Sequence, residues 1–142
     1  MRSISKEKIF IIILILFSLS INQYYGNRGI FPVDSLAHFD TGFRILLGEH
    51  PFKNYWTVSG PFVDYIQAIF FYFLGVSWQS YVFHASLINA VLSVATFIVF
   101  RNFNLNIYYS FIYSLLFSVL AYPTSGTPFV DHHSAFLSLL GI

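Results

Sequence analysis

Two aspartates are the residues of this sequence whose type and position best fit chemistry. Asp34 stands where a polar loop turns into an amphipathic helix, and Asp131 stands where a later loop enters an apolar stretch. The ordinary interpretation of each is a helix N-cap, because an Asp side chain there accepts hydrogen bonds from free backbone amides. A cap uses one carboxylate oxygen and leaves the other free, so Asp34 is also a candidate catalytic carboxylate.

Histidines follow the second aspartate directly. His132 and His133 are candidates for binding substrate or metal together with Asp131. Adjacent histidines lack the i,i+4 spacing that places two zinc ligands on one helix face. One Asp from each loop instead suits a hard divalent cation such as Mg²⁺ or Mn²⁺, so Asp34 and Asp131 are the candidate metal ligands.

The composition indicates that lipid surrounds much of the chain. Of its 142 residues, 56% are apolar and only 9% are charged, against roughly 25% charged in soluble domains. Eighteen Phe and ten Tyr exceed what the interior of a chain this short can hold. The absence of cysteine excludes disulfides and thiol chemistry, and a net charge of +1 argues against a nucleic-acid surface.

The charge-free stretches predict an all-α, polytopic membrane protein with about three complete transmembrane helices and a truncated fourth. The expected spans are residues 9–25, 78–100, 105–122 and, as a beginning only, 134–142. The basic start and the missing cleavage site favour a retained signal anchor over a cleaved signal peptide, with a cytoplasmic N-terminus. We expect a multi-pass protein of a prokaryotic inner membrane. Because a helix cannot end in hydrocarbon with unpaired carbonyls, the chain is interpreted as an N-terminal fragment.

The first outer loop, residues 26–77, is predicted to contain two juxtamembrane helices. In the first, near 35–47, an apolar stripe precedes a stop at Gly48, and Asp40 and Arg44 can pair at i,i+4. The stripe consists of Leu36, Phe39, Phe43, Leu46 and Leu47.

The second juxtamembrane helix, residues 61–74, starts at a proline and is too short to span a bilayer. If it lies in the interface, Arg101 faces the cytoplasm and Asp34 shares the outer side with Asp131, which lies in the second outer loop, 123–133. If it crosses, the two aspartates are on opposite sides. The length favours the interfacial arrangement. Within the span 78–100, His84 and Asn89 are expected to donate hydrogen bonds between helices.

This order of elements resembles the N-terminal part of the glycosyltransferase C superfamily. The similarity rests on a first span, a long outer loop with an early Asp, a helix ending at Gly48, the aromatic turn HPFKNYW (50–56) and a Pro-led helix ending FLG. Two spans joined by a short basic turn and a second loop with Asp131 complete it. The chain is most similar to the protein O-mannosyltransferase and aminoarabinose-transferase branch, and the resemblance covers nearly all of it.

The resemblance implies inverting transfer of a sugar from a polyprenyl-phosphate donor to an acceptor on the outer face of the membrane. Asp34 would be the catalytic carboxylate, or a metal ligand as in metal-dependent branches, and Asp131 would help to bind metal or substrate. Many members carry an acidic pair; here Ser35 follows Asp34 and His132 follows Asp131. The outer-loop cations that could contact the leaving phosphate are Arg28, Arg44 and Lys53.

The implied partners are membrane lipid, the lipid-linked sugar donor and an acceptor glycan, lipid or protein, without nucleic acid. The full-length form is expected to be an enzyme, whereas the 142-residue chain alone is expected to be inactive. The alternative is a non-enzymatic small membrane protein or accessory subunit whose polar residues are caps and interhelical contacts. A transporter fragment is less favoured, because paired broken helices are not evident.

Overall fold

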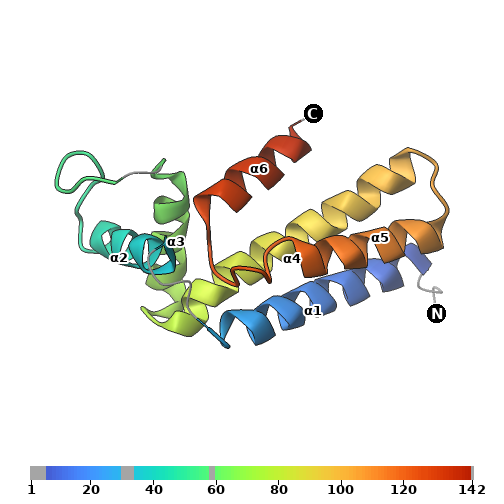
Figure 1. Ribbon diagram of the computed structural model, residues 1–142, viewed down its shortest axis with the longest axis horizontal. Helices are drawn as coiled ribbons and strands as arrows, with labels where there is room; N and C mark the ends of the chain where they lie inside the picture. Colours follow the sequence, from blue (N-terminus) through green and yellow to red (C-terminus); the bar gives the residue numbers. More distant parts are fainter. Residues whose placement is uncertain (1–5, 30–33, 58–59, 142) are drawn as a thin grey trace.

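The computed structural model describes residues 6–29, 34–57 and 60–141 of the chain, and in these residues it is all-helical. Helices α1, α4 and α5 lie side by side along the long axis, and α2 and α3 cross one end of them (Figure 1). The helices are α1 (Lys6–Gly26), α2 (Asp34–Leu46), α3 (Phe62–Leu74), α4 (Trp78–Asn102), α5 (Ile107–Leu120) and α6 (Val130–Leu140).

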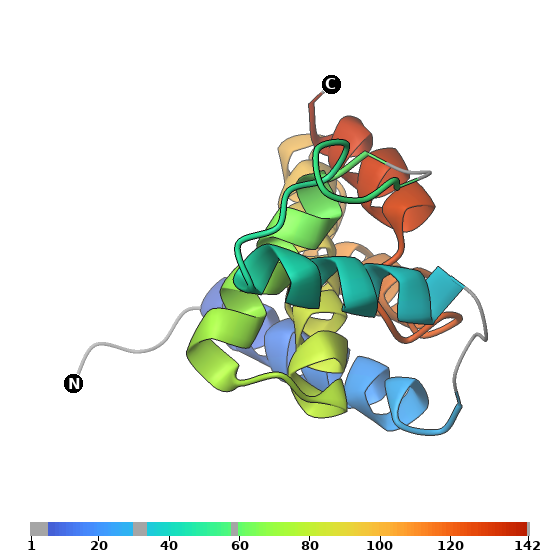
Figure 2. The same cartoon turned by 90° about the vertical axis from the view of Figure 1, so that its left-hand side faces the viewer.

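Helices α1 and α4 are long and apolar enough to cross a membrane, and they run antiparallel. At one end, Arg101 Nε donates to Glu7 Oε1 over 3.1 Å, which joins the last turn of α4 to the first turn of α1. At the other end, Trp78 Nε1 donates to the Gly26 carbonyl over 2.9 Å. The segment between these helices therefore leaves and re-enters the helical group at the same end, where α2 and α3 lie (Figure 2).

The shorter helices have bounds set by local sequence. Helix α3 follows Pro61 at its N-cap and stops at Gly75, whose φ of +82° favours glycine. Helix α5 follows Asn106, whose side chain accepts from Tyr108 N, and it has 14 residues against the 18 expected for 105–122. Helix α6 begins at Val130, so Asp131, His132 and His133 lie in its first turns rather than in a loop.

On α1 and α5, mostly small and polar residues face inward, and large apolar residues face outward. The buried stripe of α1 is Leu14, Ser18, Asn22 and Gly26, and that of α5 is Ser110, Ser114 and Ser118. Apolar side chains such as Leu16, Ile112 and Leu120 are exposed instead. A helix in water shows the reverse arrangement, whereas helices packed in lipid meet through small and polar residues.

The end of α1 approaches the loop after α5 very closely. A Cβ at Gly26 would lie 2.5 Å from Val82 Cγ1 and 2.6 Å from the Gly126 carbonyl oxygen. Next to this contact, Asn22 Nδ2 donates to Ser86 Oγ over 3.0 Å and lies 3.3 Å from the same Gly126 oxygen. The loop 121–129 is therefore packed against α1 and α4 at the end where α2 and α3 lie.

Helix α2 packs on α3 through a polar face and not through its predicted apolar stripe. Ser35, His38 and Thr41 are buried, while Leu36 and Phe43 from the stripe are exposed. Phe39 is the exception, since its ring packs on Phe71 and Tyr81. Gly42 lies against the Gln67 side chain, which lets the two helices come close. The apolar stripe is thus left facing outward, as expected for a helix at a lipid surface.

Two local predictions for α2 are confirmed. Arg44 Nε donates to Asp40 Oδ2 over 2.7 Å, which is the expected i,i+4 pair. Gly48 follows the helix with a φ of +88°, and its amide donates to the Ile45 carbonyl over 2.9 Å. These contacts fix the direction in which the chain leaves α2 toward the aromatic turn.

Candidate functional site

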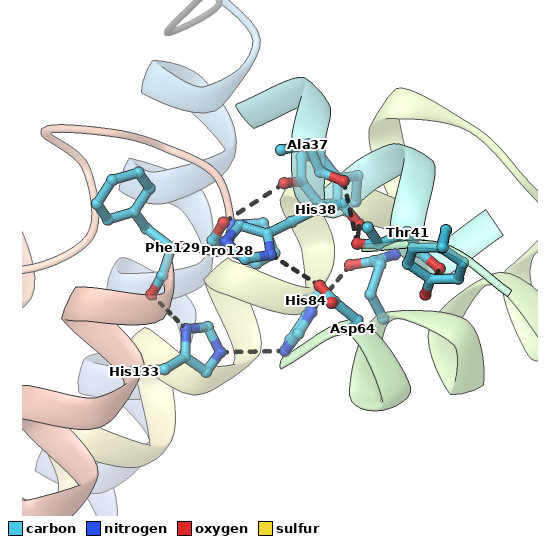
Figure 3. Close-up of polar contacts among 11 residues, drawn as sticks. Ala37, His38, Thr41, Asp64, His84, Pro128, Phe129 and His133 are labelled. Atoms are coloured by element: carbon cyan, nitrogen blue, oxygen red, sulfur yellow. Dashed lines mark hydrogen bonds and ion pairs between the residues drawn. The ribbon is translucent and has the colours of Figure 1, made fainter. Parts of the chain in front are cut away.

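A buried group of polar side chains lies where α2, α3, α4 and α6 meet (Figure 3). We call it the polar junction. The group combines three histidines with an aspartate, an amide and a phenol, each less than a tenth exposed. Its members are His38, Asp64, Gln67, His84, Tyr122 and His133.

The first contact of the polar junction joins α2 to α3. His38 Nδ1 donates to Asp64 Oδ1 over 2.7 Å, and both side chains are buried. Because a carboxylate can only accept, this bond holds the imidazole of His38 in one orientation. The second carboxylate oxygen, Asp64 Oδ2, is buried and has no partner among the described residues.

The second contact is a chain of hydrogen bonds from α6 to α3 through α4. Gln67 Oε1 can only accept, so His84 Nδ1, 2.8 Å away, carries the proton and donates it. His84 Nε2 is then an acceptor for His133 Nε2–H at 3.2 Å. His133 Nδ1 in turn accepts from the Tyr122 hydroxyl at 2.7 Å. These hydrogen bonds link α6, α4 and α3. Gln67 Nε2 is buried without a partner among the described residues, and the Phe129 carbonyl oxygen also lies 3.1 Å from His133 Nδ1.

Two polar residues of the span predicted at 78–100 form hydrogen bonds to other helices. The prediction that His84 and Asn89 bond between helices is confirmed, because His84 contacts α3 and α6, and Asn89 Nδ2 donates to the Ser118 carbonyl of α5 over 2.9 Å. Sequence reasoning did not single out His38, Asp64 or Gln67 as members of one group. Their spacing gives no signal, since each contacts a residue on another helix.

The two outer loops of the sequence analysis meet directly. Ser35 Oγ and Thr127 Oγ1 are 2.9 Å apart and both are fully buried. Asp34 is the first residue of α2, and its side chain lies outside the described part of the structure. Asp131 is exposed in the first turn of α6, where a negative charge complements the helix dipole. The start of α2 and the loop leading to Asp131 are therefore neighbours.

The adjacent histidines of α6 point to different surroundings. His133 faces the polar junction, whereas His132 lines a pocket of about 280 Å³ together with Thr124, Ser125 and Phe129. Ser125 Oγ lies 3.3 Å from His132 Nδ1. Burial lowers the pKa of His132, and the nearby charge of Asp131 opposes that shift. Of the two, only His132 can contact a molecule in this pocket.

The three candidate phosphate-binding cations differ in whether their positive charge is already paired with a carboxylate. Arg44 contacts Asp40 and Glu49, and the hydrogen bond to Asp40 is the main reason that its pKa is raised. Arg28 lies over the Tyr24 ring, with 4.3 Å from Cζ to the ring centroid. Lys53 is exposed in the turn between α2 and α3. Arg28 and Lys53 therefore suit an anionic ligand better than Arg44 does.

The described residues supply no complete metal site. No three His, Asp or Glu side chains within residues 6–29, 34–57 and 60–141 are grouped so that they could hold a metal ion. Asp131 has the neutral residues Val130 and His132 as chain neighbours, and no second carboxylate stands beside it in the chain. Asp34, the other ligand expected for Mg²⁺ or Mn²⁺, has its side chain outside the described part of the structure.

Comparisons with known proteins give no relationship for this chain. A scan against protein-family models, a search of curated proteins and a search of solved structures each found no match. The class defined by the fold is an all-helical protein with two long apolar helices that could cross a membrane.

Proposed function

We propose that this chain is the N-terminal segment of an integral-membrane glycosyltransferase that uses a polyprenyl-phosphate sugar on the outer face of the membrane. The main support is the contact between Ser35 and Thr127, which brings the start of α2 next to the loop that leads to Asp131. A transferase of this kind needs its loop residues gathered at one end of the spanning helices. The contact at that end is the arrangement that the proposal requires.

The outward apolar faces of α1 and α5 support the membrane part of the proposal. Water would make these faces costly, and lipid removes that cost. We place the N-terminus in the cytoplasm and the protein in the inner membrane of a prokaryote, because Arg2 precedes α1, Lys6 and Lys8 lie in its first turn, and Arg101 lies at the same end. Helices α2 and α3 then lie on the outer surface.

In the proposed reaction, the Asp34 carboxylate takes the proton of the acceptor hydroxyl as the acceptor oxygen attacks the anomeric carbon. The bond between that carbon and the phosphate oxygen breaks, and the polyprenyl phosphate leaves with the electron pair. General-base assistance of this type contributes about 10²–10⁴-fold. Arg28 would stabilise the departing phosphate. The further transmembrane helices that complete the donor pocket in the glycosyltransferase C superfamily would have to come from other parts of the enzyme.

The polar junction has a positioning role in this proposal. The bond between His38 and Asp64 fixes α2 on α3 four residues after Asp34. The series of hydrogen bonds from Tyr122 through His133 and His84 to Gln67 fixes α6 and α4 on α3 as well. Because α2 is held rigidly on α3, the catalytic carboxylate can move little. Small displacements of a reacting group lower the reaction rate by large factors.

The test is sugar transfer in membranes that contain the full-length enzyme, with a radiolabelled polyprenyl-phosphate sugar. Asp34→Asn should abolish transfer while the protein level is unchanged. Asp40→Asn is the matched control, because Asp40 lies two turns along the same helix and pairs only with Arg44 on the surface. Full transfer by Asp34→Asn would remove the main residue of the proposal.

A non-enzymatic membrane subunit is the second candidate. It is favoured by the way the polar residues of α4 are used, since His84, Ser86 and Asn89 all bond to other helices. In that case Asp34→Asn does not affect transfer and reduces only the amount of folded protein or of an assembled complex, whereas Asp40→Asn changes neither. Measuring protein level and transfer in the same membranes separates the two candidates.

A further inference from the structure

The turn between α2 and α3, residues 50–56, is rigid and carries an exposed aromatic pair. Asn54 closes the turn through two hydrogen bonds of 2.9 Å. Its backbone N–H donates to the His50 carbonyl, and its side-chain Oδ1 accepts from the His50 backbone N–H. Phe52 N also donates to the Tyr55 carbonyl over 2.8 Å. These internal hydrogen bonds restrict the backbone of the turn and therefore the directions of its outward side chains.

Anchors on both neighbouring helices hold the turn. The Tyr55 hydroxyl donates to the Thr41 carbonyl of α2 over 3.3 Å, and Arg44 lies over the Tyr55 ring. His50 Nδ1 lies 3.3 Å from the Tyr65 hydroxyl of α3. Figure 1 shows the turn projecting beyond α2 and α3, on the side away from α1, α4 and α5. The turn is therefore held by α2 and α3 and projects away from the long helices.

Phe52 has a backbone conformation that disfavours its own side chain. Its φ is +64°, a region that is uncommon for any residue except glycine and a genuine outlier for a bulky one. The ring gains little burial in return, since Phe52 is 57% exposed. Backbone strain of this kind persists where the surrounding structure enforces it, and it concentrates at ligand sites.

The exposed rings of Phe52 and Trp56 lie at an angle to each other, and the positively charged Lys53 belongs to the same turn. Phe52 packs edge-to-face on Trp56 at 5.6 Å between ring centroids, and Trp56 is 79% exposed. Lys53 lies between them in the chain and is the charged residue of the turn, apart from the titratable His50. A flat indole with a neighbouring wall and a cation matches a pyranose ring that carries an acidic group.

We propose that the turn 50–56 binds an anionic saccharide, with the sugar ring on Trp56 and the acid group on Lys53. This inference rests on the proposed function in one respect, namely that the saccharide is the acceptor of the transfer. Binding itself needs no catalysis, so it can be measured separately. Asp34→Asn should leave saccharide binding intact even where it abolishes transfer.

The experiment uses the full chain in detergent micelles, titrated with a galacturonic-acid tetrasaccharide and, for comparison, an uncharged glucose tetrasaccharide. The acidic tetrasaccharide should bind and protect Trp56 from acrylamide quenching, and salt should weaken it. Trp56→Ala and Lys53→Gln should each weaken binding about tenfold. Phe103→Ala is the matched control, because Phe103 is as exposed, at 80%, and is the C-cap of α4, whose last turn lies away from α2 and α3.

Phe52→Gly distinguishes a binding role from a structural one. Glycine adopts positive φ without strain, so this variant should unfold at the same or a higher temperature while it binds the acidic tetrasaccharide more weakly. A lower unfolding temperature with unchanged binding would overturn the proposal. Absence of binding, or equal binding of both tetrasaccharides, would also overturn it. So would binding of phosphatidylglycerol vesicles through Trp56 and Lys53 in place of the saccharide, because the turn would then be a membrane contact.

Discussion

The side-chain oxygens of Ser35 and Thr127 lie 2.9 Å apart, although 92 positions separate the two residues in the chain. Both side chains are fully buried, so the contact excludes water. It joins the first turn of α2 to the loop before α6 and makes one surface out of two loops. The arrangement of the proposed site depends on this contact.

A cross-link tests the contact directly. Because the chain has no cysteine, Ser35→Cys with Thr127→Cys would introduce the only two thiols. Mild oxidation should form an intramolecular disulfide, seen as a single covalent product after cleavage between the two positions and lost on reduction. Ser35→Cys with Asn102→Cys is the control, because Asn102 ends α4 at the opposite end. Equal cross-linking of both pairs would contradict the structure.

Topology can be tested with single cysteines at exposed positions. Lys53 is exposed in the turn between α2 and α3, and Asn102 is exposed at the last position of α4, which ends away from α2 and α3. If α1 and α4 cross a membrane, an impermeant thiol reagent should label Lys53→Cys in intact cells and label Asn102→Cys only after permeabilisation. Equal labelling of both in intact cells would contradict a spanning α4.

The buried pair in the polar junction should be sensitive to loss of one partner. His38→Ala leaves the Asp64 carboxylate buried without its donor, and this should lower the free energy of unfolding by about 3 kcal/mol. Adding Asp64→Asn removes the unpaired charge and should recover part of the loss. Denaturation in detergent measures both. Asp40→Asn, on the surface of the same helix, should cause no measurable change.

Gly26 should not tolerate a side chain. Gly26→Ala brings a methyl group against Val82 and the Gly126 carbonyl, and overpacking of this kind costs about 1–3 kcal/mol. Gly29→Ala is the matched control, because nothing lies within 4 Å of a Cβ built there. Thermal unfolding of the two variants in the same detergent checks this. A similar unfolding temperature for both would mean that α1 and the loop 121–129 are not in close contact.

The attachment of the aromatic turn should depend on pH in the alkaline range. Burial, followed by the charge of Asp64, raises the pKa of Tyr55 from about 10 to about 12. The folded turn therefore holds the phenol proton more tightly than the unfolded chain does. The contribution of Tyr55 is complete below pH 10 and is lost as the pH rises toward 12. Tyrosinate absorbance and Trp56 fluorescence should change together there, and Tyr55→Phe should remove that coupled change.

Several elements followed from local sequence alone. Helices α1 and α4 come from long apolar runs, and α3 comes from a short run between Pro61 and Gly75. The pair of Asp40 and Arg44 follows from i,i+4 spacing, because helix geometry places those side chains together whatever surrounds them. Local spacing predicted the apolar stripe of α2, but it did not predict which polar residues pack on the rest of the protein, among them Ser35 and His38.

The sequence by itself determined that the chain is helical and that α1 and α4 are long and apolar, because composition and periodicity act within one segment. The tertiary structure decided which polar residues meet. Hydrogen bonds between different helices and loops join His38 to Asp64, His84 to His133, and Ser35 to Thr127. The physical reason is that a buried polar group needs a partner, and the fold, not the spacing along the chain, supplies it.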